Sequence, residues 1–359
     1  MRLTRALVSA DGEAKNIPMP FFDYELPPEL IAQHPTAQRD QSRMLRVQRA
    51  SGEIAHHIFR DLSDLLHPGD LLILNNTKVL PARLRGRRER SGGKWEGLFL
   101  HEAADGLWEL VCQSRRPMRV GEWLAVEPGP LRFELVEKKE AGHWLLRPDQ
   151  SGTPAELLAR HGSMPLPHYI RKGQAEAEDT ERYQTLFAQV PGAVAASTAG
   201  LHFTPDIFER LKKRGIEKAF LTLHVGLGTF QPIRTKHFHQ HVMHKEWGEL
   251  PAETAAAIQA CKTSGGRVVA VGTTSVRVLE TVARTGPIRP WSGETDLFIY
   301  PPFEFRAVDA LITNFHLPKS TLLLLVGAFA GEDLLRKAYE AAIETNYRFF
   351  SYGDAMLVE

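Results

Sequence analysis

Histidines and carboxylates recur where predicted strands give way to loops, and together such groups can perform acid–base chemistry. An imidazole takes up and releases protons near neutral pH, and a nearby carboxylate can orient it or accept the proton. Open α/β sheets keep their ligand sites at the ends of strands. The titratable candidates in these positions are His202, His224, His244, Glu246, Asp296 and His316.

Small and hydroxyl-bearing residues flank two of these histidines and would let the backbone approach a ligand closely. Thr198 and Gly200 lie in ASTAGLHFT, and Gly226 and Gly228 lie in HVGLGTF. A dinucleotide-binding fingerprint requires GxGxxG at the start of a helix. The residues FQP follow the second motif instead, so we exclude a nicotinamide dinucleotide site and retain a binding turn.

The segment VGTTSVR joins a predicted strand to a predicted helix, and such a junction can bind an anion. Hydroxyl groups and free amides at a helix N-terminus favour a carboxylate or a phosphate. The candidates are Thr273, Thr274, Ser275 and Arg277. Hydroxyl groups also cap helices, so ligand binding would be an additional role. The GxxxxGK[ST] pattern of a P-loop is missing from this segment.

Four histidines, at positions 237, 239, 241 and 244, have a spacing that suits metal ligands on one face of a strand. No Asp or Cys completes this set, and runs of surface histidines are common, so we expect no metal. The other histidine motifs also fit imidazoles that are packed in a tight turn or hydrogen-bonded in the core.

The central part of the chain predicts a small antiparallel β-barrel or sandwich. Short runs rich in Val, Leu, Phe and Trp, such as KWEGLFL, GLWELVCQ and LRFELVEK, alternate with turns such as SGG, DG and PGP. Strands at this spacing are typical of small all-β domains. We place this domain at residues 69–150, beginning with DLLILNN after the Pro68-Gly69-Asp70 turn.

The flanking segments, 1–68 and 151–359, predict an α/β domain with a mixed sheet. Helical patterns begin at Thr153-Pro154 and Thr204-Pro205, and further helices are expected over SVRVLETVART and GEDLLRKAYEAAIET. Strands are expected over FLTLHVG, RVVAVG, LFIYP and ALITNF, and a short helix over PPELIAQH. Strands that alternate with helices favour a largely parallel sheet, so the barrel is an insertion in an α/β domain.

Composition excludes several classes of protein. The chain has 359 residues, of which 43% are hydrophobic and 24% charged, and this mixture excludes a disordered chain. A net charge of +1 excludes a globally basic coat protein, and two cysteines fit a reducing compartment. The longest apolar run, TLLLLVGAFA, is too short to span a bilayer, and the N-terminus lacks a secretory apolar segment. We expect a cytoplasmic protein.

Taken together, the motifs resemble the S-adenosylmethionine:tRNA ribosyltransferase-isomerase family of queuosine biosynthesis. The resemblance runs from about Phe22 to Val358 and includes GDLLILNNTKVLPARLRG, ASTAGLHFT, LTLHVGLGTF, HVMHKE, AVGTTSVRVLE, LITNFHLPKSTLLLLVGAFAG and YRFFSYGDAMLV. Local departures from the family pattern occur at His168, at Ser197 and at PPFEF in 301–305. They leave every titratable candidate in place.

This resemblance implies an unusual reaction on a tRNA that carries 7-aminomethyl-7-deazaguanine at the wobble position. The ribosyl unit of S-adenosylmethionine moves to the aminomethyl nitrogen and is isomerised to an epoxycyclopentane, while adenine and methionine leave. S-adenosylmethionine is therefore a consumed co-substrate, and no cofactor is implied. We expect a monomer without membrane partners. An α/β domain with an inserted β-barrel is also implied.

Under this resemblance, the site residues acquire roles. Proton transfer would fall to His202, His224, His244 and His316, with Glu246 and Asp296 as carboxylate partners, and we favour His202 and His316. The expected co-substrate ligands are Thr198, Gly200, Gly226, Gly228, Thr273, Thr274, Ser275 and Arg277. The expected tRNA ligands are Lys78, Arg83, Arg85 and Arg171. A pure RNA-binding module and a conventional methyltransferase remain competing hypotheses.

Overall fold

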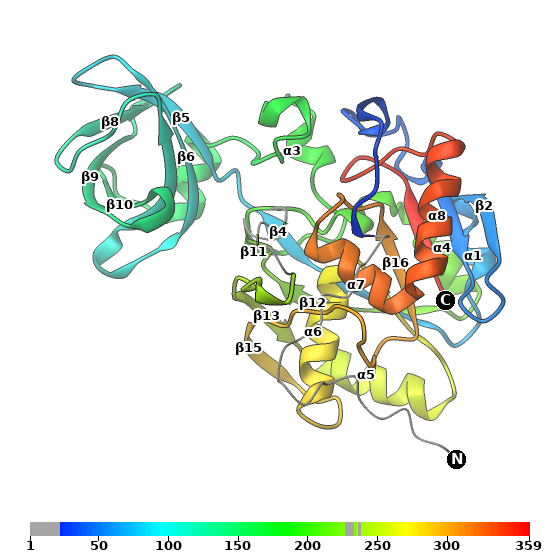
Figure 1. Cartoon of the computed structure of the whole chain (residues 1–359). Coiled ribbons are helices and arrows are strands. Elements are labelled where there is room, and N and C mark those ends of the chain that lie inside the picture. The colour runs from blue at the N-terminus through cyan, green and yellow to red at the C-terminus, as the bar shows by residue number, and fades with distance from the viewer. Residues whose placement is uncertain (1–21, 227–232, 234, 236–237) are drawn as a thin grey trace, which may run out of the picture.

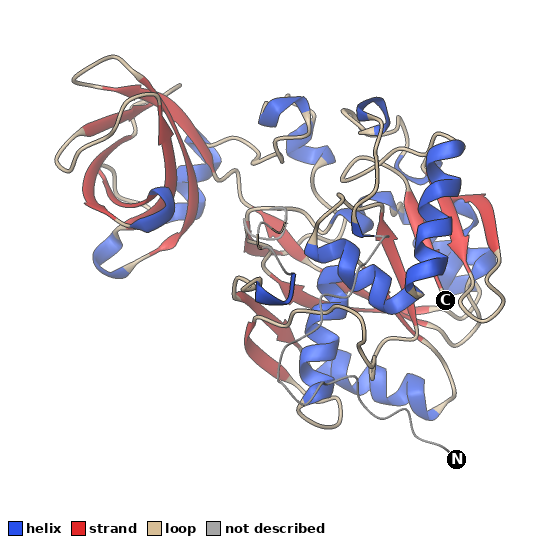
Figure 2. Cartoon of the chain, in the orientation of Figure 1, coloured by secondary structure: helices blue, strands red, loops and turns tan. Residues whose placement is uncertain are grey.

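The computed structural model describes residues 22–226, 233, 235 and 238–359 and divides them into a large mixed sheet and a closed barrel (Figures 1 and 2). Helices lie against the large sheet, and the barrel stands to one side of it (Figure 2). This arrangement confirms the predicted fold class, an α/β body with a small antiparallel barrel inserted in the chain. None of the described helices is long and apolar enough to cross a membrane.

The large sheet has nine strands, and its central four are parallel. From edge to edge the strands are β15 (Trp291–Thr295), β13 (Glu246–Leu250), β12 (Glu217–Leu223), β3 (Leu71–Asn75), β14 (Val268–Val271), β16 (Ala310–Asn314), β17 (Ala355–Val358), β1 (Arg43–Val47) and β2 (Ile54–Ile58). The parallel strands β12, β3, β14 and β16 bring their carboxyl ends to the same edge.

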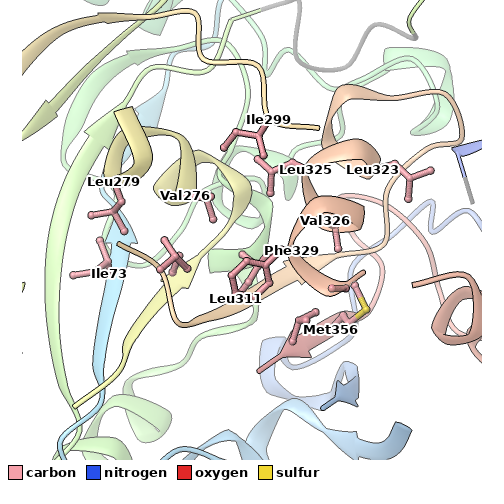
Figure 3. Close-up of a cluster of buried hydrophobic side chains, with 14 of the residues drawn as sticks. Ile73, Val276, Leu279, Ile299, Leu311, Leu323, Leu325, Val326, Phe329 and Met356 are labelled. Carbon is pink, nitrogen blue, oxygen red and sulfur yellow. The ribbon is translucent and has the colours of Figure 1, made fainter. Parts of the chain in front are cut away.

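Helices cover both faces of this sheet. They are α1 (Leu62–Leu65), α4 (Pro205–Lys213), α5 (Ala252–Thr263), α6 (Thr273–Arg284), α7 (Thr321–Ala330) and α8 (Glu332–Glu344). Two further helices, α2 (Pro154–His161) and α3 (Asp179–Arg182), contribute to neither of the hydrophobic cores on these faces. Figure 3 shows side chains of α6 and α7 packed towards β3, β16 and β17. Helices α1 and α4 pack on the opposite face. Burial on both faces explains why β14 is apolar throughout and β3 is apolar up to its last residue, Asn75.

The barrel closes from six antiparallel strands in the order β10-β7-β6-β5-β8-β9. Their bounds are β5 (Arg83–Arg88), β6 (Lys94–Glu102), β7 (Trp108–Ser114), β8 (Trp123–Val126), β9 (Arg132–Lys138) and β10 (His143–Pro148). Alternate side chains point inward, so that Leu84, Trp108 and Phe133 lie in the barrel core. Leu157 and Leu158 of α2 join the same core.

Several sequence expectations are wrong in detail. The strand at 71–75 belongs to the centre of the large sheet rather than to the barrel, which begins at Arg83. Helix α2 packs on the barrel, although its sequence was assigned to the α/β domain. The expected strand LFIYP is irregular and follows β15, and PPELIAQH forms only a 3-10 turn over Pro28–Leu30. The physical reason for the first correction is that the uninterrupted apolar run LLIL in β3 is the pattern of a parallel strand buried on both faces, whereas barrel strands alternate.

The chain passes between the two bodies twice, and the two passages are hydrogen-bonded to each other. The amide of Arg83 donates to the carbonyl of Ser163 at 3.1 Å, and the amide of Ser163 donates back at 2.8 Å. Beside them, strand β4 (Thr77–Val79) pairs with β11 (Val190–Ala193) outside both large sheets. These contacts join the barrel to the edge of the large sheet at which β3 and β12 end.

Candidate active site

A cavity of about 600 Å³ lies at the carboxyl ends of β14 and β16, where the N-termini of α6 and α7 also converge. Figure 1 shows these helices side by side over the sheet. The lining residues are Tyr169, Ala196, Ser197, Thr198, Ala199, Val225, Gly272, Thr273, Thr274, Thr313, Asn314, Phe315, His316, Leu317, Ser320, Leu322, Phe350 and Ser351. Aromatic and aliphatic walls with a few polar groups are typical of small-molecule sites.

The turn between β14 and α6 forms one wall of the cavity. Gly272 has φ of +87°, a backbone conformation that L side chains rarely adopt. This turn presents Thr273 and Thr274 to the cavity, and Thr274 Oγ1 lies 3.1 Å from Ser197 Oγ. The first amides of an α-helix have no intrahelical acceptor and carry the positive end of its dipole. This wall is therefore suited to an anionic group such as a carboxylate.

Two residues of the same motif point elsewhere. Ser275 donates from its hydroxyl to the carbonyl of Val271 at 2.8 Å and is fully buried. Arg277 is buried and forms an ion pair with Glu246, and its remaining nitrogens donate to the carbonyls of Thr295 and Leu297. The donors of Arg277 are thus engaged within the protein, and the structure does not support its expected role as a ligand for the co-substrate carboxylate.

Glu246 anchors the G-x-G turn rather than an imidazole. Its Oε1 accepts the amide of Gly226 at 2.7 Å, while Oε2 faces Arg277. His244 lies just before β13 and is exposed, so the expected pairing of His244 with Glu246 on one strand face does not occur. Glu246 instead links the backbone of Gly226, just after β12, to Arg277 on α6. Gly228 lies outside the described residues.

His316 is the histidine that lines the cavity. Its Nε2 lies 2.8 Å from Thr313 Oγ1, and its amide donates to Tyr339 Oη at 2.9 Å. Burial lowers the pKa of His316 to about 3, so the imidazole is neutral at pH 7. The neutral imidazole can accept a proton, but a pKa this far below 7 makes it a weak base and makes its conjugate acid a strong proton donor. His316 therefore has the position and the protonation state of a proton carrier.

His202 lies behind the cavity wall and is linked to it by hydrogen bonds. Thr198 Oγ1 donates to Asn314 Oδ1 at 2.8 Å, and Asn314 Nδ2 lies 3.2 Å from His202 Nε2. His202 Nδ1 lies 2.7 Å from Ser42 Oγ, which donates to the carbonyl of Arg39. Burial, together with the charges of Arg348 and Arg39, lowers the pKa of His202 to about 3. His202 therefore positions Asn314 and Thr198.

The remaining predicted residues are not brought to the cavity. His224 stacks on Trp247 at 5.2 Å and bonds Thr77 Oγ1 at 2.8 Å, and burial lowers its pKa. Asp296 is exposed beyond β15. At Gly200, a Cβ atom would lie 2.7 Å from Phe187 Cζ, so this glycine serves packing rather than ligand contact.

Of the predicted residues, the cavity brings together Thr198, Thr273, Thr274 and His316. The sequence analysis missed several further lining residues. Asn314 was visible in the TNFH motif at the end of a strand, and Ser320 in the helix start KSTLLLL. Tyr169 and Ser351 had no such signal. Their hydroxyl oxygens lie 2.7 Å apart, but the two residues lie 182 positions apart in the sequence, and no local pattern predicts that they meet. Among the described lining residues, no Asp, Glu, Lys or Arg is present.

The predicted RNA-binding arginines all form ion pairs with carboxylates, and two of them share one. Arg83 and Arg85 both pair with Glu96, and Arg171 pairs with Asp179. Lys78 is exposed on β4. The alternation along β5 places Arg83, Arg85 and Arg87 on the outer face, but the sequence cannot show which carboxylates the neighbouring strand contributes.

Metal-ligand geometry occurs among the described residues at His34, Glu176 and Glu178, whose ligand atoms lie within 4.8 Å of one another. All three side chains are exposed, and acidic surface groups of this kind are common without an ion. His34 and the two glutamates lie apart from the lining of the cavity.

Comparison with known proteins identifies the family. A family model described as queuosine biosynthesis protein matches residues 19–358. The S-adenosylmethionine:tRNA ribosyltransferase-isomerase of Symbiobacterium thermophilum is 51% identical, with 94% of this chain and 98% of that protein aligned. Its counterpart from Carboxydothermus hydrogenoformans is 50% identical over the same shares. The chain belongs to the queuosine biosynthesis protein family.

A solved structure is similar as well. The crystal structure of an S-adenosylmethionine tRNA ribosyltransferase from Thermotoga maritima matches with a TM-score of 0.55 and 40% sequence identity. The match covers 94% of this chain and 100% of that one. Because the match covers so much of this chain, it includes both the large sheet and the barrel.

Proposed function

We propose that this protein transfers and isomerises the ribosyl group of S-adenosylmethionine onto 7-aminomethyl-7-deazaguanine at the wobble position of a tRNA. The product is epoxyqueuosine-tRNA. The bonds from the ribose to adenine and to sulfur break, so adenine and methionine leave. A bond to the aminomethyl nitrogen forms, together with a new carbon–carbon bond that closes the five-carbon ring of the epoxycyclopentane. S-adenosylmethionine is consumed as a co-substrate. Monomeric state and cytoplasmic location stay predictions.

The observation that carries this proposal is the imidazole of His316, the one imidazole among the described lining residues of a cavity whose other described residues offer hydroxyl, amide and apolar groups. Abstraction of hydrogen from the carbon beside a sulfonium needs a base, and departure of adenine needs a proton donor. His316 is neutral at pH 7 and can perform both steps in turn. The absence of charged side chains among the described lining residues leaves the sulfonium unpaired, which keeps the neighbouring C–H acidic.

The cavity also offers places for the rest of the co-substrate. The N-terminus of α6, with Thr273 and Thr274, faces the cavity and suits the methionine carboxylate. Tyr169 and Phe350 supply aromatic surface, with ring centroids 4.9 Å apart, for the adenine. Thr198 and Asn314, held by His202, can bind the ribose hydroxyls.

The two competing hypotheses predict different products. A conventional methyltransferase would release S-adenosylhomocysteine and add a methyl group to its substrate. A pure RNA-binding module would release nothing. The relatives named as ribosyltransferase-isomerases favour the proposed reaction over both.

The test is product analysis by mass spectrometry. We expect the purified protein, S-adenosylmethionine and an anticodon stem-loop carrying 7-aminomethyl-7-deazaguanine to yield adenine and methionine in equal amounts. The RNA should gain the mass of the epoxycyclopentane group. An RNA with unmodified guanine at the wobble position is the control and should remain unchanged. S-adenosylhomocysteine as the product, or no turnover, would contradict the proposal.

A further inference from the structure

A second, smaller cavity of about 260 Å³ adjoins the first, and both are lined by Ser351. Arg39, from a 3-10 turn before β1, and Arg182, at the end of α3, contribute guanidinium groups to it. His202, which holds Asn314 in place, also lines it. This cavity therefore lies beside the residues that shape the larger cavity.

Backbone carbonyls, rather than carboxylates, hold these two arginines. Their guanidinium nitrogens donate over 2.6–3.4 Å to the carbonyl oxygens of Leu201, Glu181, Thr36 and Ala37. Within the described part of the chain, no carboxylate forms an ion pair with either guanidinium, in contrast to Arg83, Arg85 and Arg171. Within the described residues, neither positive charge is therefore paired directly with a carboxylate at the wall of the cavity.

The local environment disfavours such charges. Burial and the charge of Arg182 lower the pKa of Arg39, and the exposed carboxylate of Glu181 opposes this only at longer range. Nε of Arg182 is buried and has no hydrogen-bond partner among the described residues. A third guanidinium, that of Arg348, is close enough to lower the pKa of His202. Clustered, partly buried cations with an unused donor indicate a missing anion.

We propose that this second cavity binds a phosphate of the tRNA backbone next to the wobble nucleotide, through Arg39 and Arg182. This inference rests on the proposed function. A phosphate supplies the missing negative charge and acceptors that match the planar fork of a guanidinium. Contacts to phosphate fix the register of a nucleic acid without reading its sequence. A phosphate held here, beside Ser351, would direct the adjoining nucleotide into the larger cavity.

The experiment combines protein variants with RNA in which single phosphates are made neutral. Anticodon stem-loops carrying 7-aminomethyl-7-deazaguanine, each with one methylphosphonate near the wobble nucleotide, are titrated against the wild type and Arg182→Gln. We expect Arg182→Gln to weaken binding of the all-phosphate RNA about tenfold. The slope of log K against log salt should fall by about one.

Coupling between the two changes decides the question. At one position, the methylphosphonate should weaken binding to the wild type but cause no further loss in Arg182→Gln. At the other positions the two losses should add. Additive losses at every position, or unchanged affinity of Arg182→Gln, would overturn the phosphate site. Arg182→Lys keeps the charge and should retain the salt slope while losing part of the affinity.

Controls separate this site from folding and from the proposed function. Arg336→Gln removes an exposed arginine that pairs with Glu340 on α8, and its RNA affinity should equal that of the wild type. Thermal unfolding shows whether each variant is folded, and Arg39→Lys provides a second test if Arg182→Gln is not. Adenine release by the wild type tests the proposed function separately, because the coupling is measured by binding alone.

Discussion

His316 and His202 share a low pKa but differ in what they contact. His316 lines the larger cavity, where its neutral ring can carry a proton. His202 is enclosed by hydrogen bonds to Ser42 and Asn314 and acts through them. Sequence patterns cannot separate these roles, because both histidines occur where a predicted strand gives way to a loop. The two roles differ because of contacts between residues more than a hundred positions apart in the sequence, such as His202 and Ser42.

The low pKa values of His202 and His316 predict that stability is lost in mild acid. Each folded pKa is about 3, below the value of about 6.5 in an unfolded chain. Between these values the unfolded state binds the extra proton, so stability that is complete above pH 6.5 falls as the pH decreases. The expected loss at pH 5 is about 2 kcal/mol per histidine.

Urea unfolding at pH 7.5 and pH 5 measures this loss. His202→Gln should lose about 2 kcal/mol less on acidification than the wild type. His56→Gln, which replaces an exposed histidine that is hydrogen-bonded to Tyr347, is the comparison. An equal pH dependence in the wild type and His202→Gln would show that His202 is not held neutral by the fold.

Arg277 provides a second test at this scale. Arg277→Met would remove the guanidinium that pairs with the buried carboxylate of Glu246, and breaking a buried ion pair costs about 3–5 kcal/mol. We therefore expect a large loss in the free energy of unfolding, measured by urea titration. The alternative, in which Arg277 binds the co-substrate carboxylate, predicts weaker S-adenosylmethionine binding with stability almost unchanged. The exposed variant Arg284→Met, at the end of α6, should have little effect on stability.

At the scale of elements, the site depends on short turns that follow parallel strands. The β14–α6 turn and the end of β16 supply most of the polar groups, and both follow from the order of strands. Gly272 permits the first turn, because its φ is +87° and an added Cβ would lie 3.1 Å from Ser197 Oγ and 3.3 Å from Thr274 Oγ1. A substitution here changes the shape of the cavity as well as the backbone energy.

Comparison of Gly272→Ala with Gly265→Ala separates these effects. Gly265 also has a positive φ, of +76°, but an added Cβ would meet no atom within 4 Å. Both variants should lose about 1–2 kcal/mol of stability for the left-handed backbone. We expect only Gly272→Ala to weaken S-adenosylmethionine binding, measured by calorimetry. Equal affinities of the two variants would remove this turn from the co-substrate site.

Much of the fold could be predicted from the sequence, because local patterns determine it. Capping sequences such as Thr153-Pro154 begin helices where expected, and alternating runs mark the barrel strands. The assignment of β3 to the wrong body shows the limit. A strand's pattern indicates how many of its faces are buried, but the identity of its neighbours depends on pairings such as β3 with β12 and β14.

The candidate site was predicted less well than the fold, for the same reason. Thr273, Thr274 and His316 lie where sequence motifs indicated, at strand ends. Arg277 and Glu246 were assigned to the chemistry because both are charged and lie close to such motifs. In the structure they neutralise each other, and only tertiary contacts reveal that pairing. The sequence did not predict the cavity lined by Arg39 and Arg182, because these arginines are far apart in the chain and meet only in the folded structure.

At the scale of the whole molecule, the barrel is attached by two adjacent passages of the chain. Gly162 lies in one of them, and a Cβ added there would lie 1.8 Å from the carbonyl oxygen of Pro81 in the other. The two passages are therefore packed backbone against backbone. This close contact limits the ways in which the barrel can be placed relative to the cavity.

Gly162→Ala should force these passages apart. We expect a loss of about 1–3 kcal/mol in stability and faster limited proteolysis near residues 81–83 and 162–164. Gly93→Ala, in the β5–β6 hairpin, is the control. Its added Cβ would come no closer than 3.3 Å to another atom, the side-chain oxygen of Ser91. Unchanged cleavage in Gly162→Ala would show that the junction tolerates movement.

Single-turnover release of adenine by His316→Gln tests most directly whether the larger cavity performs the reaction. The variant is mixed with S-adenosylmethionine and substrate tRNA, and adenine is quantified over time alongside the dissociation constant of S-adenosylmethionine. If His316 carries the proton, release should slow by about 10²–10⁴-fold while the dissociation constant changes little. Release at the wild-type rate would contradict the account, because no other imidazole lines the described cavity.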